Sequence, residues 1–114
     1  MPSSAGTAFR PAGANSTIYL TGNTGATAAA LLPNTPSVGS FQVRVRNKGT
    51  ADLYIAFGPN ANTTVTAPVS NGAAGALGVT ASEIEVITVP ASNTYVAITS
   101  SVTANVEITT GYGI

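Results

Sequence analysis

Hydrophobic and polar residues alternate along several short segments, and the segment that begins at Phe41 alternates most regularly. Phe41, Val43 and Val45 fall on one side of an extended chain, and Gln42, Arg44 and Arg46 fall on the other. A period of two residues is that of a β-strand with one buried face. Asn47-Lys48-Gly49-Thr50 then supplies turn residues, and Leu53–Phe57 is a second expected strand that ends at Gly58. We therefore expect an antiparallel hairpin over these residues.

The second half of the chain repeats this pattern. Glu83–Val89 alternates, with Ile84 and Val86 opposed to Ile87, and stops at Pro90. Further strands are expected at Thr94–Thr99 and Val102–Thr109. A tight turn at Ser100-Ser101 would join these last two strands into another hairpin.

The N-terminal third is less regular, because prolines, glycines and small polar residues interrupt it. Thr17–Thr21 fits a strand with Ile18 and Leu20 on one side and Tyr19 on the other. Ala26–Leu32 fits either a strand or a short helical turn. Residues 1–38 are therefore predicted to be an extended arm with loops.

Two further stretches lie between the expected hairpins. Thr63–Thr66 is a short β-branched run, and Pro68–Gly78 is rich in Gly and Ala and is expected to be an irregular connection between sheets. Turn signals recur about every 8–12 residues and no convincing amphipathic helix appears, which is typical of all-β domains. We expect an antiparallel two-sheet sandwich of jelly-roll-like type, with residues 39–114 as its body.

The small number of charged residues gives information about the surface of the protein. Only 7% of the 114 residues are charged and the formal net charge is +0, whereas about a quarter of residues are charged in an ordinary soluble domain. Interspersed charges normally oppose association. So few charges indicate a surface that other polypeptides cover. The equal numbers of basic and acidic residues argue against a nucleic-acid partner, and the longest apolar runs are too short to span a membrane.

The residue types leave little chemistry for catalysis. The chain has no His, Cys or Trp, which excludes a disulfide, a thiolate nucleophile and a cysteine metal site. Glu83 and Glu85 would lie roughly 6.5–7 Å apart on one strand, a spacing that glycoside hydrolases use, but two solvated carboxylates are the simpler interpretation. No cofactor or metal ion is expected, and the chain is not expected to be an enzyme.

Two segments resemble a family. FQVRVRNKGTADLYIAFG, followed by ASEIEVITVPASNTYVAITSSVTANVEITTGYGI, is similar to small virion proteins of tailed bacteriophages, over roughly residues 40–114. Ser100-Ser101 departs from the family's Gly-containing turn. The resemblance implies a β-sandwich structural protein, and most closely a cement or decoration protein that binds the outer capsid and bridges subunits of the major capsid protein.

Composition and resemblance together predict a phage capsid cement protein, made in the bacterial cytoplasm and located on the capsid exterior. Its expected partners are the major capsid protein and other copies of itself, as a dimer or trimer. The alternative is a receptor- or glycan-recognition module of a fibre or tail. The candidate interface residues are Phe9, Arg10, Tyr19, Arg44, Arg46, Lys48 and Tyr112.

Overall fold

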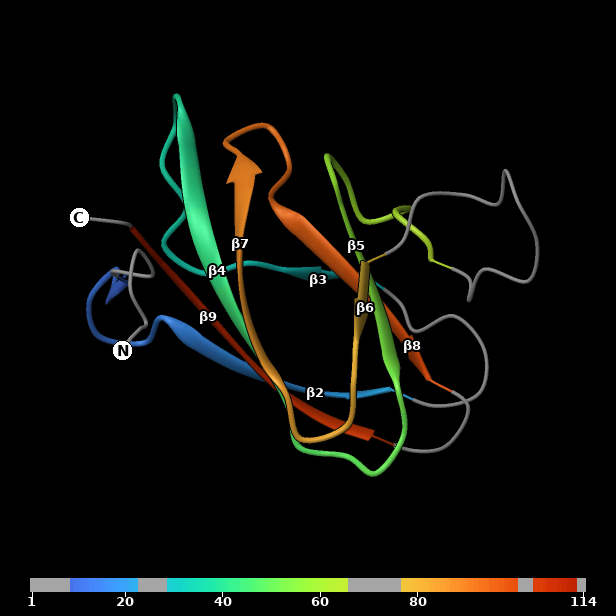
Figure 1. Cartoon of the computed structure of the whole chain (residues 1–114). Coiled ribbons are helices and arrows are strands. Elements are labelled where there is room, and N and C mark those ends of the chain that lie inside the picture. Colours follow the sequence, from blue (N-terminus) through green and yellow to red (C-terminus); the bar gives the residue numbers. More distant parts are fainter. Residues whose placement is uncertain (1–8, 23–28, 66–76, 101–103, 113–114) are drawn as a thin grey trace.

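The computed structural model describes residues 9–22, 29–65, 77–100 and 104–112. These residues form nine strands and no helix, and the strands make two antiparallel sheets (Figure 1). The described part of the chain contains no helix that is long and apolar enough to cross a membrane. The expectation of an all-β fold with two antiparallel sheets is confirmed.

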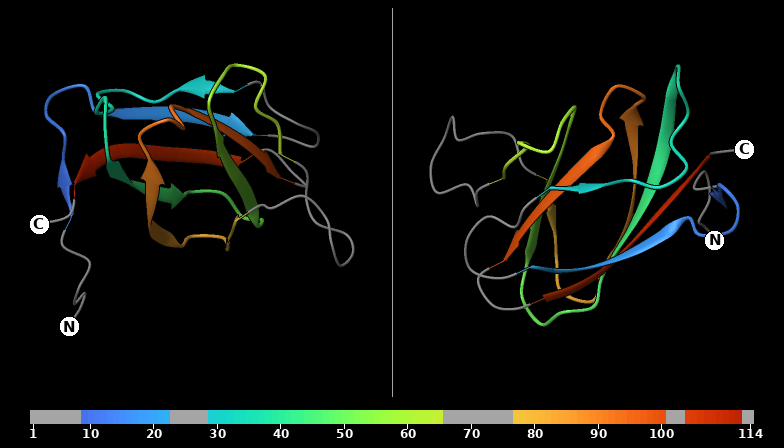
Figure 2. Two further views of the ribbon diagram at one scale, coloured as in Figure 1. Left: turned by 90° about the horizontal axis from the view of Figure 1, so that it is seen from above. Right: turned by 180° about the vertical axis from the view of Figure 1, so that it is seen from behind.

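The first sheet, named here the β9 sheet, is organised around its longest strand. β9 (Ala104–Tyr112) pairs on one side with β4 (Ser40–Asn47), which in turn pairs with β7 (Ile84–Pro90). Its other side is shared by β2 (Thr17–Gly22) and the short β1 (Arg10–Pro11). β9 therefore joins the N-terminal strands to the rest of this sheet (Figure 2).

The second sheet, named here the β8 sheet, has the order β3-β8-β5-β6. β8 (Tyr95–Ser100) and β5 (Leu53–Gly58) form its centre, and the short strands β3 (Ala30–Leu31) and β6 (Leu77–Val79) form its edges. β3 comes from the segment for which the sequence left a strand or a helical turn open.

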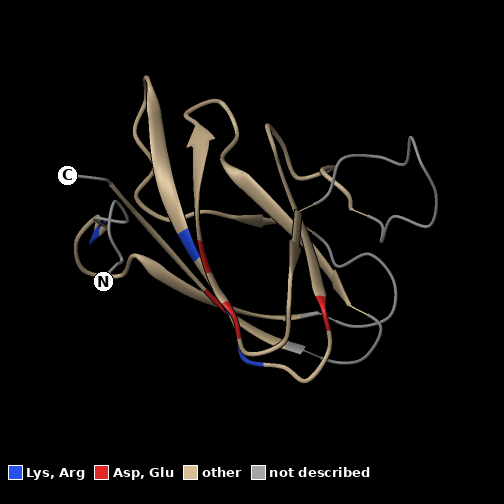
Figure 3. Cartoon of the chain, in the orientation of Figure 1, with Lys and Arg blue, Asp and Glu red and all other residues tan. Residues whose placement is uncertain are grey.

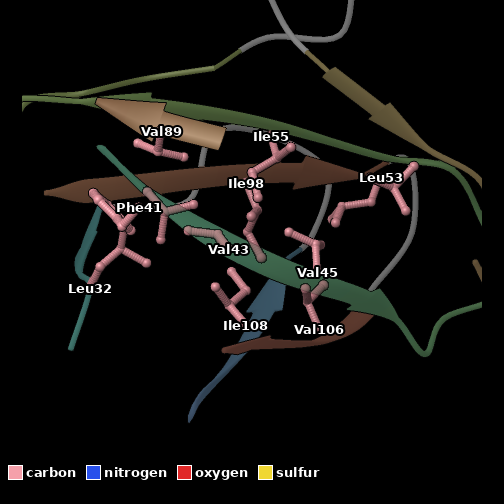
Figure 4. Close-up of a cluster of buried hydrophobic side chains, with 12 residues drawn as sticks. Leu32, Phe41, Val43, Val45, Leu53, Ile55, Val89, Ile98, Val106 and Ile108 are labelled. Carbon is pink, nitrogen blue, oxygen red and sulfur yellow. The ribbon is translucent and has the colours of Figure 1, made fainter. Parts of the chain in front are cut away.

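One hydrophobic core lies between the two sheets, and alternate residues of each central strand supply it (Figure 4). The predicted inward set of β4 is confirmed, because Phe41, Val43 and Val45 are all buried. β5 and β8 supply side chains from the opposite wall. The cluster comprises Leu32, Phe41, Val43, Val45, Leu53, Ile55, Val79, Val89, Val96, Ile98, Val106 and Ile108. Burial of this apolar surface is the main stabilising contribution to the fold.

The hairpin expected from Phe41 to Phe57 is wrong, because β4 and β5 belong to different sheets. The link between them crosses from one sheet to the other, and the buried side chain of Asn47 holds it. The Asn47 amide donates to the carbonyls of Ala51 and Val79 at 3.0 Å each, and its oxygen accepts from the Gly49 N–H at 2.9 Å. These contacts join the link between β4 and β5 to the end of β6.

The second expected hairpin is also wrong. β8 pairs with β5 and β3, whereas β9 lies in the other sheet. Both strands have apolar side chains on the side that faces the core. This alternation is the same in either sheet, so it does not show which sheet a strand belongs to. The Ser100 hydroxyl donates to the Asp52 carbonyl at 3.1 Å and so attaches the end of β8 to the start of β5. Residues 101–103 lie outside the described residues.

The described N-terminal residues contain three short strands as well as the expected loops, and an extended arm is not confirmed. The strand expected at Thr17–Thr21 is confirmed, and its Ile18 and Leu20 pack against the core as predicted. Leu32 is itself a core residue. β1 and β2 pair with β9, and β3 pairs with β8, so these strands belong to the two sheets. Residues 1–8 and 23–28 lie outside the described residues.

The region between β5 and β7 gives two smaller results. Thr63 to Val65 form no strand, and the Thr63 hydroxyl donates to the Asn60 carbonyl at 2.7 Å, as in a turn. β6 lies at the end of the stretch that was expected to be irregular, and residues 66–76 lie outside the described residues.

Candidate binding face on the β9 sheet

The outer face of the β9 sheet carries a row of side chains that crosses four strands. Tyr19 on β2 is opposite Glu107 on β9, Glu107 is opposite Arg46 on β4, and Arg46 is opposite Ile84 on β7. Directly opposite residues in antiparallel strands have Cβ atoms about 4.5–5.5 Å apart. The row therefore forms a continuous band from one side of the sheet to the other.

A second row lies beside the first, two residues along each strand. It joins Thr17, Thr109, Arg44 and Val86 in register. The hydroxyls of Thr17 and Thr109 are 2.8 Å apart and share a hydrogen bond. Arg44 and Arg46 thus point to the same side of the sheet, as the predicted alternation requires.

The few charged residues gather at this part of the molecule. Figure 3 shows them on β4, β7 and β9 and in the adjoining loops, where β4 leads into β5 and β6 leads into β7. The exceptions are Arg10 on β1, at the opposite end of β9, where it is in register with Tyr112, and Asp52, which directly precedes β5 of the other sheet. The charges of this chain are therefore concentrated, with most of the described surface left neutral.

Glu107 is the centre of the charged group. Its two carboxylate oxygens contact Arg46 Nη1 at 3.5 Å and Lys48 Nζ at 3.4 Å. The side chains of Arg46 and Lys48 are 48% and 38% exposed. The Lys48 ammonium also lies 5.5 Å from the centre of the Tyr19 ring, within the range of a cation–π contact. Such long, solvated contacts orient the cations but hold them weakly.

A hollow of about 200 Å³ opens beside these cations and is lined by Arg46, Asn47, Lys48 and Ser82. Asn47 forms a rigid part of its wall, because its amide is committed to the loop carbonyls. Ser82 has a backbone φ of 64°, in the left-handed region that non-glycine residues seldom adopt. The hollow is thus lined by two cationic residues, a committed amide and a serine.

The two glutamates beside β7 have opposite electrostatic environments. Glu83 Oε1 accepts hydrogen bonds from the Thr80 hydroxyl and N–H at 2.8 and 3.0 Å, and these lower the pKa of Glu83. Partial burial raises the pKa of Glu85, and the nearby charge of Glu83 raises it further. In register Glu85 is opposite the inward-facing Val45, so its side chain lies on the core side of an edge strand.

The remaining candidate residues form a separate group at the far end of β9. The Phe9 ring lies over Gly111, since a Cβ built there would meet Phe9 Cζ at 2.6 Å. Arg10 is exposed and Tyr112 packs against the core. Of the predicted interface residues, the structure therefore brings together Tyr19, Arg46 and Lys48, with Arg44 in the next row. It places Phe9, Arg10 and Tyr112 elsewhere.

The outer face of the β8 sheet has a different character. Its outward positions in register are Tyr54, Ala56, Tyr95, Ala97 and Thr99, and none of them is charged. Ala97 and Thr99 are nevertheless buried, at 0% and 6% exposure. Leu31, at the edge of the same sheet, is 59% exposed. This face is neutral and closely covered.

Sequence reasoning missed two contributors to the charged face, Glu107 and Ser82. Glu107 occupies an outward position in the alternating run Asn105–Thr109, and this alternation was a usable signal once the strand had been assigned. Ser82 carries no such signal, because a turn between β6 and β7 brings it to the hollow.

The described residues contain no group of three or more acidic side chains placed to hold a metal ion. In comparisons with protein-family models, with curated proteins and with solved structures, nothing matches this chain.

Proposed function

We propose that this protein is a phage capsid cement protein, which binds the outer capsid surface and bridges subunits of the major capsid protein. The observation that carries the proposal is the uneven distribution of charge. Charged side chains gather on one part of the β9 sheet, whereas the side chains exposed at the edges of the β8 sheet, Leu31 and Leu77, are uncharged. A protein that acts by binding another protein needs a surface with a small desolvation free energy, and an uncharged surface has one.

Exposed apolar side chains support the same proposal. Leu31, Val38 and Leu77 are 59%, 78% and 41% exposed. Single exposed apolar residues are ordinary on a protein surface. Here few charged side chains lie near them. A protein partner could therefore cover this surface without burying an unpaired charge.

The strand order supports a jelly roll as the type of fold. β2, β9, β4 and β7 are neighbours in one sheet, and β3, β8, β5 and β6 are neighbours in the other. Between β2 and β9 nearly every connection passes from sheet to sheet, the link from β5 to β6 being the exception. This is the order of the double Greek key in jelly rolls, which are common in viral capsid proteins. A jelly roll alone implies no function, and the cement role rests on the surface.

Cosedimentation with empty heads of the phage that encodes the chain tests the proposal. Increasing amounts of protein are mixed with heads that lack it, and the bound fraction is measured after centrifugation. We expect saturable binding at a fixed ratio to coat subunits. Heads from an unrelated phage serve as the control. Binding to host cells or to glycans without binding to heads would instead support a receptor-recognition module and overturn the cement role.

A further inference from the structure

The outer face of the β9 sheet carries more positive than negative charge, although the whole chain is neutral. Arg44, Arg46 and Lys48 lie on this face with one carboxylate, Glu107. Within the described residues, the other two glutamates near it form no ion pair with these cations. Glu83 is bonded to Thr80, and Glu85 is in register with inward-facing Val45. Counted over these outward side chains alone, the face carries an excess of two positive charges, and Glu83 and Glu85 beside it keep their own negative charges.

The cations at the hollow retain unused hydrogen-bonding capacity. A guanidinium has five N–H donors and an ammonium has three. Within the described residues, Arg46 uses Nη1 on Glu107 Oε1, and Lys48 uses Nζ on Glu107 Oε2. Both contacts are long, at 3.5 and 3.4 Å, compared with about 2.7–2.9 Å for a strong charge-assisted bond. A second acceptor can therefore bind without breaking a strong internal pair.

We propose that the hollow lined by Arg46, Asn47, Lys48 and Ser82 binds the carboxylate of an acidic segment on a protein partner. Arg46 and Lys48 would donate to the carboxylate oxygens, and the Ser82 hydroxyl would supply a further donor. Tyr19 and Ile84, 54% and 47% exposed, flank this part of the face and offer apolar contact to the rest of the segment. If the proposed cement function is correct, which this identification of the partner requires, the segment belongs to the major capsid protein.

The charge pattern favours an acidic polypeptide over a nucleic acid. A nucleic acid presents regularly spaced phosphates and is bound by several neutralising cations. This face has a small excess charge, concentrated at one hollow, and a carboxylate at its centre. A single acidic side chain matches it better than a chain of phosphates does.

The first experiment tests the hollow without any phage particle. The ¹⁵N-labelled protein is titrated with a blocked Asp-Glu-Asp-Glu peptide, and amide shifts are followed by NMR. We expect saturable shifts at residues 46–48 and 82, and none with the matched Asn-Gln-Asn-Gln peptide. Shifts that are scattered, or absent, would overturn the proposal. Tighter binding of a single-stranded oligonucleotide at the same residues would overturn it in favour of a nucleic acid.

Four variants sharpen the test. Arg46→Gln and Lys48→Gln should each weaken peptide binding, by about tenfold for Arg46 because it can donate two parallel bonds. Arg10→Gln removes a cation from the opposite end of β9 and is the matched control, with no expected effect. Glu107→Gln removes the internal competitor and should tighten binding about two- to threefold. Equal affinities in all four variants would contradict the assignment.

The same variants in the cosedimentation experiment separate this inference from the proposed function. If the wild-type chain binds heads and Arg46→Gln binds at least tenfold more weakly, both hold. If the wild type and all variants bind heads equally, the cement role stands and the hollow is not the docking site. If the peptide binds at the hollow but no variant, nor the wild type, binds heads, the carboxylate site stands and its partner is not the capsid.

Discussion

The outer faces of the two sheets differ in what they present to the surroundings. The β9 sheet presents a lattice of Tyr, Arg, Glu and Thr, in which cations surround Glu107. The β8 sheet presents Tyr, Ala and Thr at its outward positions, and two of these residues are buried. Both faces cover the same core, so core packing does not require the difference. The few charged side chains of the chain therefore lie mostly on or beside the outer face of the β9 sheet, and the outward positions of the β8 sheet carry none.

This contrast separates two tasks of a surface. A neutral face loses little solvation when a partner covers it, whereas a charged face selects a partner by complementary charge. We propose that the molecule uses both, with the exposed uncharged side chains at the edges of the β8 sheet, Leu31 and Leu77, available for contact and the β9 side for recognition. Four predictions can break or sharpen the contrast.

The largest effect is expected at the junction of the two sheets. Asn47 is 1% exposed and its amide donates to three backbone carbonyls, those of Ala51, Val79 and Thr80. Asn47→Ala leaves these buried groups without a donor, and we expect a loss of about 2–4 kcal/mol in the free energy of unfolding. Urea unfolding measures it. Asn47→Asp keeps the acceptor for the Gly49 N–H but loses the donors and should also be strongly destabilised. A loss below about 1 kcal/mol for both variants would show that other contacts hold the junction.

A glycine on each outer face gives a matched pair. An added Cβ at Gly111 would meet the Arg10 carbonyl oxygen and the Phe9 ring, whereas one at Gly78 would lie 3.4 Å from the Tyr54 ring. We expect Gly111→Ala to cost about 1–3 kcal/mol by displacing β1 from β9, and Gly78→Ala to be close to neutral. Thermal unfolding of the two variants measures the difference. Equal melting temperatures would remove this distinction between the faces.

The pH dependence of stability should arise on the charged side, with opposite signs at two neighbouring glutamates. The folded-state pKa of Glu83 is lowered by the Thr80 hydrogen bonds, so its contribution is present at neutral pH and lost as pH falls through that pKa. The pKa of Glu85 is raised by burial, so its ionisation opposes folding as pH rises through that pKa.

These signs are tested with two substitutions of the same kind. At pH 7 we expect Glu83→Gln to lower the melting temperature and Glu85→Gln to raise it slightly. The Glu85→Gln difference should disappear below the ordinary glutamate pKa of 4.5, whereas the Glu83→Gln difference should disappear only below the lowered folded-state pKa of Glu83. Thermal unfolding from pH 3 to pH 7 measures them. Shifts of the same sign at pH 7 would contradict the assigned environments.

The smallest effect on stability is expected for the residue most important to the proposed recognition. Arg46 pairs with Glu107 across solvent-exposed surface, and such pairs contribute about 0–1 kcal/mol. Arg46→Gln should therefore change the free energy of unfolding by less than about 1 kcal/mol and lose its small effect in high salt. Urea unfolding at low and high salt measures this. A large loss would mean that Arg46 serves the fold instead of a partner.

The sequence was sufficient to predict much of the local structure. The alternation from Phe41 to Arg46 identified both the strand and its buried side, and Ile18 and Leu20 were correctly placed opposite Tyr19. Connectivity was not accessible in the same way. Turn residues such as Lys48-Gly49 fit a hairpin and a crossing equally well, and the choice depends on Asn47, whose partners Val79 and Thr80 are about thirty residues distant in sequence.

The candidate face was predictable only in part. Arg44, Arg46 and Lys48 are close in sequence, and strand alternation places both arginines on one side. The role of Glu107 depends on the pairing of β9 with β4 across 61 residues, which no local pattern encodes. The strands within the expected arm were hard to predict for a related reason. Residues 9–22 are poor in large apolar groups, but the partner strand β9 supplies backbone hydrogen bonds that composition does not reveal.

The central position of β9 has a consequence for how the chain reaches its fold. β1, β2 and β4 all pair with β9, which is the last strand of the described sequence. The hydrogen bond between Thr17 and Thr109, for example, joins residues 92 positions apart. A ribosome therefore releases the early strands before their common neighbour has been synthesised. Sheets closed by such distant pairings form slowly, so nascent copies spend an interval with unpaired edges. During that interval the sparse ionic side chains provide little protection from self-association.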